Sequence, residues 1–274
     1  MTAVLELDGL TRRYAGLVAV DRVSLCVERG GVHALIGPNG AGKTTLFNLV
    51  SGLARPSAGR VRLLGQDVTR LPADRRAALG LGRTFQNIRV FGAMTVLENA
   101  LTGLHAWLRP GVAGAVLRLP RARAREREAV ARARAALDLV GLGARADERA
   151  ASLPYGDQRR LEIARAMASS PRLLLLDEPA AGMNPAETEA LAALIRAVGA
   201  SGTTVLLVEH DMGFVMALSD RVAVLNFGRL IADGPPAAIR QDPAVIEAYL
   251  GPKVAARLAA AGAEGLRAGL RGAG

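Results

Sequence analysis

The 274-residue sequence is short of several residue types, and each shortage excludes a class of protein. A single cysteine, Cys26, rules out an internal disulfide. No apolar run approaches the roughly 20 residues that a transmembrane helix needs. The opening residues 1–8, MTAVLELD, lack the charged and then apolar pattern of a secretory signal. We therefore expect a cytoplasmic protein with neither a transmembrane segment nor a signal peptide.

Aromatic residues make up only 3% of the chain, too few for the stacking platform of a single-stranded nucleic-acid binder. The net charge is nevertheless +10. Residues 105–134 contain eight arginines and two glutamates, and residues 251–274 contain four basic residues and one acidic residue. Three interpretations are open: a solvated helix surface with a basic tail, contact with an anionic membrane surface, and nucleic-acid binding. Because aromatics are so few, we expect no nucleic-acid partner.

Lysine is scarce as well, since only two of the 35 basic residues are lysines. One of them, Lys43, lies in a segment that matches the phosphate-binding pattern G-x-x-x-x-G-K-[ST] at every specified position. An apolar run typical of a buried strand, residues 32–36, precedes the segment, and residues 46–50 have the character of a helix. The predicted ATP-binding residues are Gly37, Pro38, Asn39, Gly40, Ala41, Gly42, Lys43, Thr44 and Thr45.

This loop has the chemistry that a nucleotide triphosphate requires. Its glycines let backbone N–H groups converge on the β- and γ-phosphates, and the following helix adds its positive N-terminal end. We expect Lys43 to neutralise phosphate charge and the Thr44 hydroxyl to bind Mg²⁺. ATP and Mg²⁺ are therefore the expected ligands.

A second motif places two carboxylates at the end of an apolar strand. Four leucines, residues 173–176, are followed by Asp177, Glu178 and a proline. The end of such a strand lies at the carboxyl edge of a parallel sheet, beside the phosphate loop. We expect Asp177 to hold Mg²⁺ through water and Glu178 to orient and deprotonate the water that attacks the γ-phosphate.

Three further side chains extend the predicted site. Gln86 lies where a helical region begins, and its amide can contact the Mg²⁺ shell and report on movement of that region. His210 follows the apolar run 205–208 at an edge from which it can reach the γ-phosphate. Tyr14 can stack on adenine. Taken singly, each has an ordinary alternative: a surface glutamine, a surface histidine and a packing tyrosine.

The remaining pattern predicts an α/β protein. Residues 4–8, 23–27, 60–64, 203–208 and 221–225 have the apolar spacing of strands, and residues 121–140 and 186–199 that of helices. The alanine- and arginine-rich part indicates a helical subdomain inserted at about 86–165. We expect the basic tail, residues 251–274, to be poorly ordered beyond a short helix.

Pro154 and Gly156 lie at the predicted start of a further helix. The segment consists of Leu153, Pro154, Tyr155, Gly156 and Asp157, and apolar residues follow at helical spacing. The N-terminus of such a helix is a second potential anion site.

In this order, the motifs resemble those of the ATP-binding subunits of ABC transporters over roughly residues 3–250. The resemblance implies a RecA-like P-loop NTPase core with an N-terminal antiparallel β subdomain and an inserted α-helical subdomain, all within residues 1–250. In that family two ATPases meet head to tail. Residues 153–157 would then contact a partner's ATP in trans, and residues 180–185 would form the D-loop at the dimer seam.

A closer resemblance is to the ATP-binding subunits of branched-chain amino-acid importers, the LivG-like group. It rests on residues 83–86, 94–99, 155–165, 177–182, 209–212 and 242–251. Two positions depart from the family pattern: Pro154 stands where most members have the signature serine, and Asp157 replaces a glutamine. The missing hydroxyl implies that the ATP site which this segment completes loses one contact to phosphate.

The resemblance implies an ATPase at the cytoplasmic face of the membrane that drives import of branched-chain amino acids. Its implied partners are a paralogous second ATPase or a second copy of this chain, two permease subunits, and an extracytoplasmic solute-binding protein. Importers of urea, short amides or other amino acids are alternatives. A soluble ABC-type ATPase acting on nucleic acid or ribosomes is the alternative from another class.

Overall fold

The computed structural model describes residues 3–86, 88–105 and 120–251. The basic tail 252–274 and residues 106–119, the centre of the first basic stretch, lie outside the described residues. Within the described ranges, no helix combines the length and the apolar character needed to cross a bilayer.

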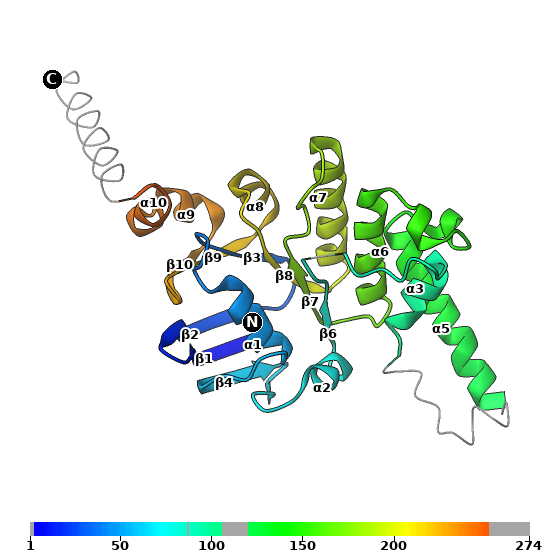
Figure 1. Cartoon of the computed structure of the whole chain (residues 1–274), viewed down its shortest axis with the longest axis horizontal. Coiled ribbons are helices and arrows are strands. Elements are labelled where there is room, and N and C mark those ends of the chain that lie inside the picture. The colour runs from blue at the N-terminus through cyan, green and yellow to red at the C-terminus, as the bar shows by residue number, and fades with distance from the viewer. Residues whose placement is uncertain (1–2, 87, 106–119, 252–274) are drawn as a thin grey trace.

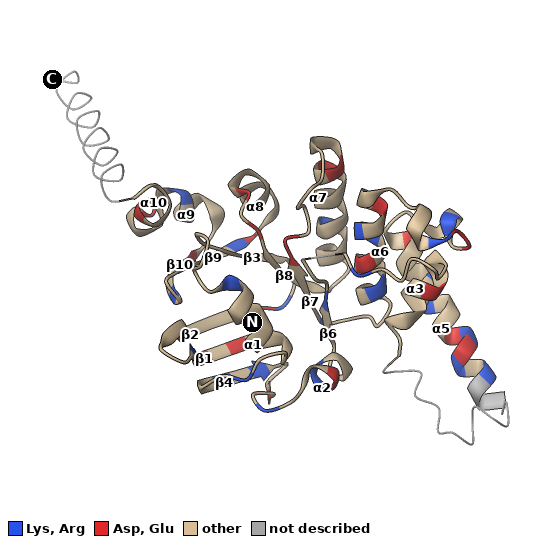
Figure 2. Cartoon of the chain, viewed as in Figure 1, with Lys and Arg blue, Asp and Glu red and all other residues tan. Residues whose placement is uncertain are grey.

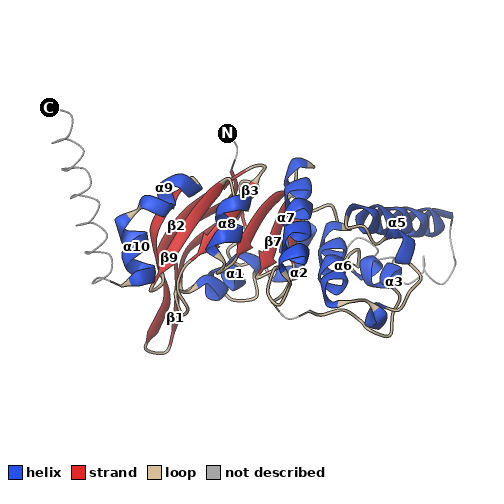
Figure 3. Ribbon diagram, turned by 90° about the horizontal axis from the view of Figure 1, so that it is seen from above, coloured by secondary structure: helices blue, strands red, loops and turns tan. Residues whose placement is uncertain are grey.

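Two sheets lie beside each other, with helices around the larger one (Figures 1 and 3). The smaller sheet is antiparallel, in the order β2-β1-β4-β5. Its strands are β1 (Ala3–Tyr14), β2 (Leu17–Glu28), β4 (Ala58–Leu63) and β5 (Gln66–Asp67). Leu7 pairs with Leu25 on one side and Val61 on the other, so one apolar face is continuous across the sheet.

The larger sheet has six strands in the order β10-β9-β3-β8-β7-β6 and is parallel except for the edge strand β10. Its strands are β3 (Val32–Ile36), β6 (Leu81–Arg83), β7 (Leu173–Asp177), β8 (Thr204–Val208), β9 (Arg221–Asn226) and β10 (Arg229–Gly234). The predicted strands are confirmed, with shifts at their ends.

The central strands are apolar on both faces because both faces are covered. In β7, Leu173 and Leu175 face the smaller sheet and α1, whereas Leu174 and Leu176 face the helices on the other side. The helices are α1 (Lys43–Ser51), α2 (Ala73–Ala78), α3 (Val96–Thr102), α5 (Pro120–Leu139), α6 (Tyr155–Met167), α7 (Pro185–Ala200), α8 (Met212–Leu218), α9 (Pro236–Gln241) and α10 (Pro243–Leu250).

Helices α3, α5 and α6 pack on one another at one end of the molecule (Figures 1 and 3). They lie between β6 and β7 in the chain, as do two short 3₁₀ helices, η1 (Gly143–Arg145) and η2 (Ala150–Ser152). Their place agrees with a helical region inserted in the α/β core. The boundaries 86 and 165, and the division of the chain at residue 250, stay predictions.

Local signals set several helix starts. The Thr95 hydroxyl accepts from the Glu98 N–H while the Glu98 carboxylate accepts from the Thr95 N–H, and Asn184 and Glu187 form the same reciprocal capping pair before α7. The described part of α5 alternates basic and acidic residues on its surface (Figure 2), with Arg132 paired to Glu128 at 2.7 Å. This pattern is typical of a solvated helix face.

One buried arginine connects α1 to the segment that follows it. Arg76 on α2 is 1% exposed, and its guanidinium donates to the carbonyls of Leu49 and Val50 at the C-terminal end of α1 and to those of Leu71 and Thr69. Burial lowers the pKa of Arg76 to about 10, which leaves the group charged at neutral pH. The positive charge lies at the negative end of the helix dipole, where it is stabilising.

Replacing Arg76 with methionine should lower the free energy of unfolding by about 2–4 kcal/mol, because the last turn of α1 loses a charged donor to buried carbonyls. The midpoint of urea unfolding measures the change. Arg75→Met, at an exposed neighbouring position, should change stability by less than about 0.5 kcal/mol. Equal midpoints for the two variants would contradict the role of Arg76.

Candidate functional site

The phosphate loop joins β3 to α1 and has the conformation that its glycines permit. Gly42 has a φ of 101°, and a Cβ at this position would collide with the Ala19 carbonyl of β2. Gly42 caps α1 without a side-chain hydrogen bond, so the first N–H groups of the helix have no side-chain acceptor at the cap. These groups and the positive helix end fit a phosphate group.

Lys43 is buried at the base of the loop. Its ammonium donates to the Gly37 carbonyl at 2.5 Å and to the Pro38 carbonyl at 3.1 Å. Burial lowers the pKa of Lys43, and the nearby Glu178 carboxylate opposes that change. The loop carbonyls are therefore the partners that a bound phosphate would replace. Thr44 is exposed on the first turn of α1, as a hydroxyl that binds a metal requires.

The two carboxylates at the end of β7 separate because the backbone turns sharply between them. Glu178 has a φ of 47°, a left-handed conformation uncommon for a non-glycine residue, and its N–H donates to the Val208 carbonyl at 2.9 Å. Asp177, 4% exposed, points inward to the Arg83 guanidinium at 3.1 Å. Burial raises the pKa of Asp177, and Arg83 opposes that rise.

Glu178 faces the two predicted polar partners. The Gln86 amide donates to one oxygen of Glu178 at 2.8 Å, and Nδ1 of His210 lies 3.8 Å from the other. The structure therefore brings together Lys43, Gln86, Glu178 and His210 from four separate segments. This is an arrangement suited to holding water between a carboxylate and a phosphate.

No group of three histidine, cysteine, aspartate or glutamate side chains suited to a metal forms among the described residues. Mg²⁺ keeps most of its waters and takes further oxygens from substrate phosphates, so a hydroxyl and one carboxylate suffice. Thr44 and Asp177 are the predicted hydroxyl and carboxylate, with the Gln86 amide as a further predicted ligand, and these three roles stay predictions.

Tyr14 lies at the end of β1, at the hairpin that leads into β2. The Arg12 guanidinium is centred 4.3 Å from the middle of the Tyr14 ring, and it also donates to the Arg55 carbonyl at 2.7 Å. The ring is 43% exposed. Arg12 stacks against the Tyr14 ring, and the exposed part of the ring leaves surface on which adenine could stack.

The segment 153–157 begins α6 and contacts the loop after Glu178. The Tyr155 hydroxyl donates to the Ala181 carbonyl at 2.9 Å, and Asp157 pairs with Arg145 at 2.6 Å. Pro154 caps α6 without a side-chain hydrogen bond. Leu153 and Gly156 are buried, whereas Pro154 and Tyr155 are exposed. A Cβ at Gly156 would lie 2.8 Å from the Glu187 carboxylate, so a side chain there would require Glu187 to move.

Sequence reasoning missed several buried charged residues that support the site. Glu209 accepts from the Ala180 N–H at 2.9 Å and from the His210 N–H at 3.2 Å, and burial raises its pKa. Arg83 bonds Asp177 and also the Asn48 and Ser51 side chains of α1. The only signal in the sequence was a charged residue directly after an apolar run, as at Glu209 after residues 205–208.

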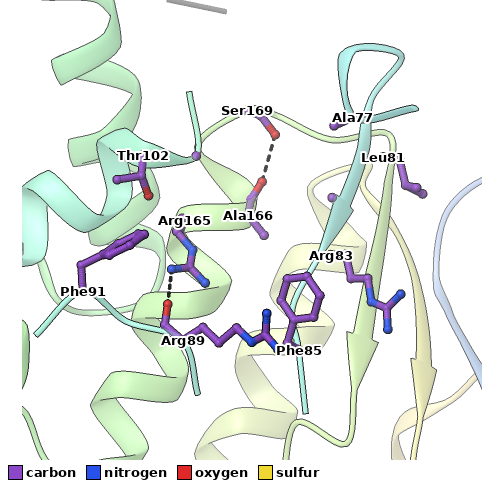
Figure 4. Close-up of a pocket in the computed structure, with 12 residues that line it drawn as sticks. Ala77, Leu81, Arg83, Phe85, Arg89, Phe91, Thr102, Arg165, Ala166 and Ser169 are labelled. Atoms are coloured by element: carbon purple, nitrogen blue, oxygen red, sulfur yellow. Dashed lines mark hydrogen bonds between the residues drawn. The ribbon is translucent and has the colours of Figure 1, made fainter. Parts of the chain in front are cut away.

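A groove of about 420 Å³ lies beside the site, between β6 and the helices α3 and α6 (Figure 4). The Phe85 ring lies between the Arg83 and Arg89 guanidiniums, at 5.2 and 4.9 Å. Phe91, 51% exposed, and Arg165 also line it. The groove therefore combines apolar surface with positive charge.

Comparison with known proteins agrees with this geometry. Residues 20–181 match the family described as ABC transporter, and residues 229–251 match the family described as branched-chain amino acid ATP-binding cassette transporter. The chain is 49% identical over 249 residues to the high-affinity branched-chain amino acid transport ATP-binding protein BraF of Pseudomonas aeruginosa, across 90% of this chain and 98% of that protein. It is 47% identical over 249 residues to LivG of Escherichia coli, with the same coverage.

A crystal structure of the ADP conformation of an ATP-binding cassette of an ABC transporter matches with a TM-score of 0.80 and 30% identity, over 92% of this chain and 100% of that one. The P-loop NTPase fold and the resemblance to LivG-like subunits are thereby confirmed. The chain belongs to the ABC transporter family, as an ATP-binding subunit.

Proposed function

We propose that this chain is the ATP-hydrolysing subunit of an importer of branched-chain amino acids and binds at the cytoplasmic face of the membrane. ATP-binding subunits of ABC transporters hydrolyse ATP to drive transport. The observation that most supports the hydrolytic role is the convergence of Gln86 and His210 on Glu178. The solute class is supported by the relatives' names and by the match at residues 229–251.

In this proposal the chain's own residues bind ATP and orient and deprotonate the attacking water. The phosphate loop and Lys43 hold the phosphates, and Glu178 takes a proton from the attacking water. Gln86 and His210 hold that water and the carboxylate in place. Thr44, Gln86 and Asp177 would hold Mg²⁺, which would offset the negative charge of the phosphates while the γ-phosphoryl group is transferred to water and ADP leaves. Tyr14 stacks on adenine.

Glu178→Gln should retain ATP affinity but lower turnover by at least about 10²-fold, because it removes the base and leaves the phosphate loop intact. Lys43→Ala should weaken ATP binding itself. A fluorescent-nucleotide titration and a phosphate-release assay measure the two quantities. Turnover by Glu178→Gln within a few-fold of wild type would refute the role of Glu178 as the base.

We also propose that two ATPases pair head to tail, so that residues 153–157 meet the partner's nucleotide. The exposed Pro154 and Tyr155 are the surface that this contact needs, and they adjoin the D-loop through Ala181. Pro154 offers no hydroxyl, so the ATP site that it completes has one fewer hydrogen bond to phosphate than a site completed by serine.

The isolated chain should be mostly monomeric, because its own ATP faces a signature segment that it does not supply. Glu178→Gln with ATP should dimerise, since bound nucleotide is not consumed. Light scattering with and without ATP distinguishes the states. A stable dimer of the wild-type chain in the absence of nucleotide would count against head-to-tail closure.

The groove beside Gln86 is our proposed docking site for a permease subunit. Phe85 and Phe91 offer apolar surface, and Arg89 and Arg165 offer positive charge. A short permease segment with an apolar side chain and a carboxylate fits this chemistry. A segment bound there would contact Phe85, Arg89 and Phe91, and Phe85 is the chain neighbour of Gln86.

Uptake of radiolabelled leucine tests the importer role in cells that depend on this chain. Glu178→Gln should abolish both uptake and ATP hydrolysis. Phe91→Ser should reduce uptake at least about tenfold and leave hydrolysis by the purified chain within about twofold, because the ring is exposed and lines only the groove. Unchanged leucine uptake with both variants would refute import of this solute class by this chain.

A further inference from the structure

Three charged residues spaced three apart on α6 form a cluster: Arg159 and Glu162 are buried and Arg165 is half-buried. Arg159 is 2% exposed and Glu162 is 1% exposed. The Glu162 carboxylate pairs with Arg159 at 3.1 Å and with Arg165 at 3.4 Å. Burial raises the pKa of Glu162, and both arginines oppose the rise. None of the three has a role in the hydrolysis proposed above.

The cluster makes hydrogen bonds to the backbone of Phe85, Gln86 and Arg89, which we call the Gln86 segment. Arg159 donates to the Phe85 carbonyl at 2.9 Å and to the Gln86 carbonyl at 2.6 Å. Glu162 accepts from the Arg89 N–H at 2.8 Å, and Arg165 donates to the Arg89 carbonyl. Figure 4 shows this last bond at the wall of the groove. We name Arg159, Glu162 and Arg165 the α6 clamp.

The clamp also connects Gln86 to the first turn of α6 through a chain of hydrogen bonds that begins and ends beside Glu178. The Gln86 side chain bonds Glu178, and its carbonyl bonds Arg159. Arg159 lies 3.5 Å from the Tyr155 hydroxyl, which bonds Ala181, three residues after Glu178. The Gln86 backbone and the first turn of α6 are therefore bonded to each other and, through Ala181, to the loop after Glu178.

Stability alone does not account for this arrangement. Buried ion pairs are often no more stabilising than apolar residues of the same volume, because both charges lose their water. Arg159 in addition leaves its Nε without a hydrogen-bond partner. What the charged groups provide is a fixed geometry, because the planar guanidinium bonds two adjacent carbonyls and a carboxylate at once.

We propose that the α6 clamp fixes the backbone of Phe85, Gln86 and Arg89 against α6, in the position from which the Gln86 amide reaches Glu178. Its members are positioning residues that act through Gln86. The inference rests on the proposed role of Gln86 in hydrolysis.

A double-mutant cycle on the purified full-length chain tests the clamp. Arg159→Met should lower kcat for ATP hydrolysis about tenfold and leave KM for ATP within about twofold, because the phosphate loop is untouched. The double variant Arg159→Met/Gln86→Ala should be no slower than Gln86→Ala alone, since both changes remove the same effect. Arg127→Met, at an exposed arginine of α5, is the matched control and should retain wild-type kcat.

The possible results separate the clamp from the proposed function. If Gln86→Ala lowers kcat but the two effects multiply, Arg159 does not act through Gln86 and only the clamp is overturned. If Gln86→Ala leaves kcat unchanged, the role of Gln86 is wrong and the clamp is overturned with it. A loss confined to KM would also overturn the clamp.

A second variant guards against misfolding. If Arg159→Met fails to bind ATP with wild-type affinity, Glu162→Gln takes its place in the cycle. This change preserves volume and an acceptor for the Arg89 N–H but removes the charge that orients both arginines. It should lower kcat several-fold in the wild-type background and have no effect in the Gln86→Ala background. Additive losses would again overturn the clamp.

Discussion

The rest of the site depends on how α1 is held at its two ends. Its N-terminus begins at Lys43 after a cap residue, Gly42, that makes no side-chain hydrogen bond, and the helix dipole gives this end a partial positive charge that suits a phosphate. Its C-terminus has the opposite need, because the last carbonyls are buried. Arg76 donates to the carbonyls of Leu49 and Val50, and Arg83 to that of Phe47 and to side chains of the last turns. The carbonyls at the C-terminal end of α1 therefore have donors within the protein, and the N-terminal end remains for a phosphate.

Arg83 extends this constraint to the chemistry. The same guanidinium that holds the end of α1 bonds Asp177, so the phosphate loop's helix and the carboxylate at the end of β7 share one anchor. Arg159 does the equivalent for Gln86 and α6. A guanidinium suits both places because it presents several donors in a fixed plane, which an ammonium does not. The chain's preference for arginine, with only two lysines among 35 basic residues, matches this use.

The sequence predicted the strands, the main helices and the nucleotide motifs well, because these depend on local spacing. It did not predict the anchors. Arg76, Arg83 and Arg159 stand among many arginines, and composition alone makes them look like surface residues. Glu162 stands between the apolar residues Leu161 and Ile163, which was a visible signal, but its partner before the helix, the Arg89 N–H, lies 73 positions away. A buried charge becomes recognisable only when its partner is located.

The sequence by itself determined the phosphate loop, since strand, glycine-rich turn and helix follow one another within 20 residues and each requires only its neighbours. It also determined that Asp177 and Glu178 end a strand with both faces buried. Only the tertiary structure decided which residues meet there. Gln86 and Glu178 are 92 positions apart, and Arg83 and Asp177 are 94 apart. They meet because β6 pairs with β7 in register, and strand order in a sheet is set by packing among distant segments.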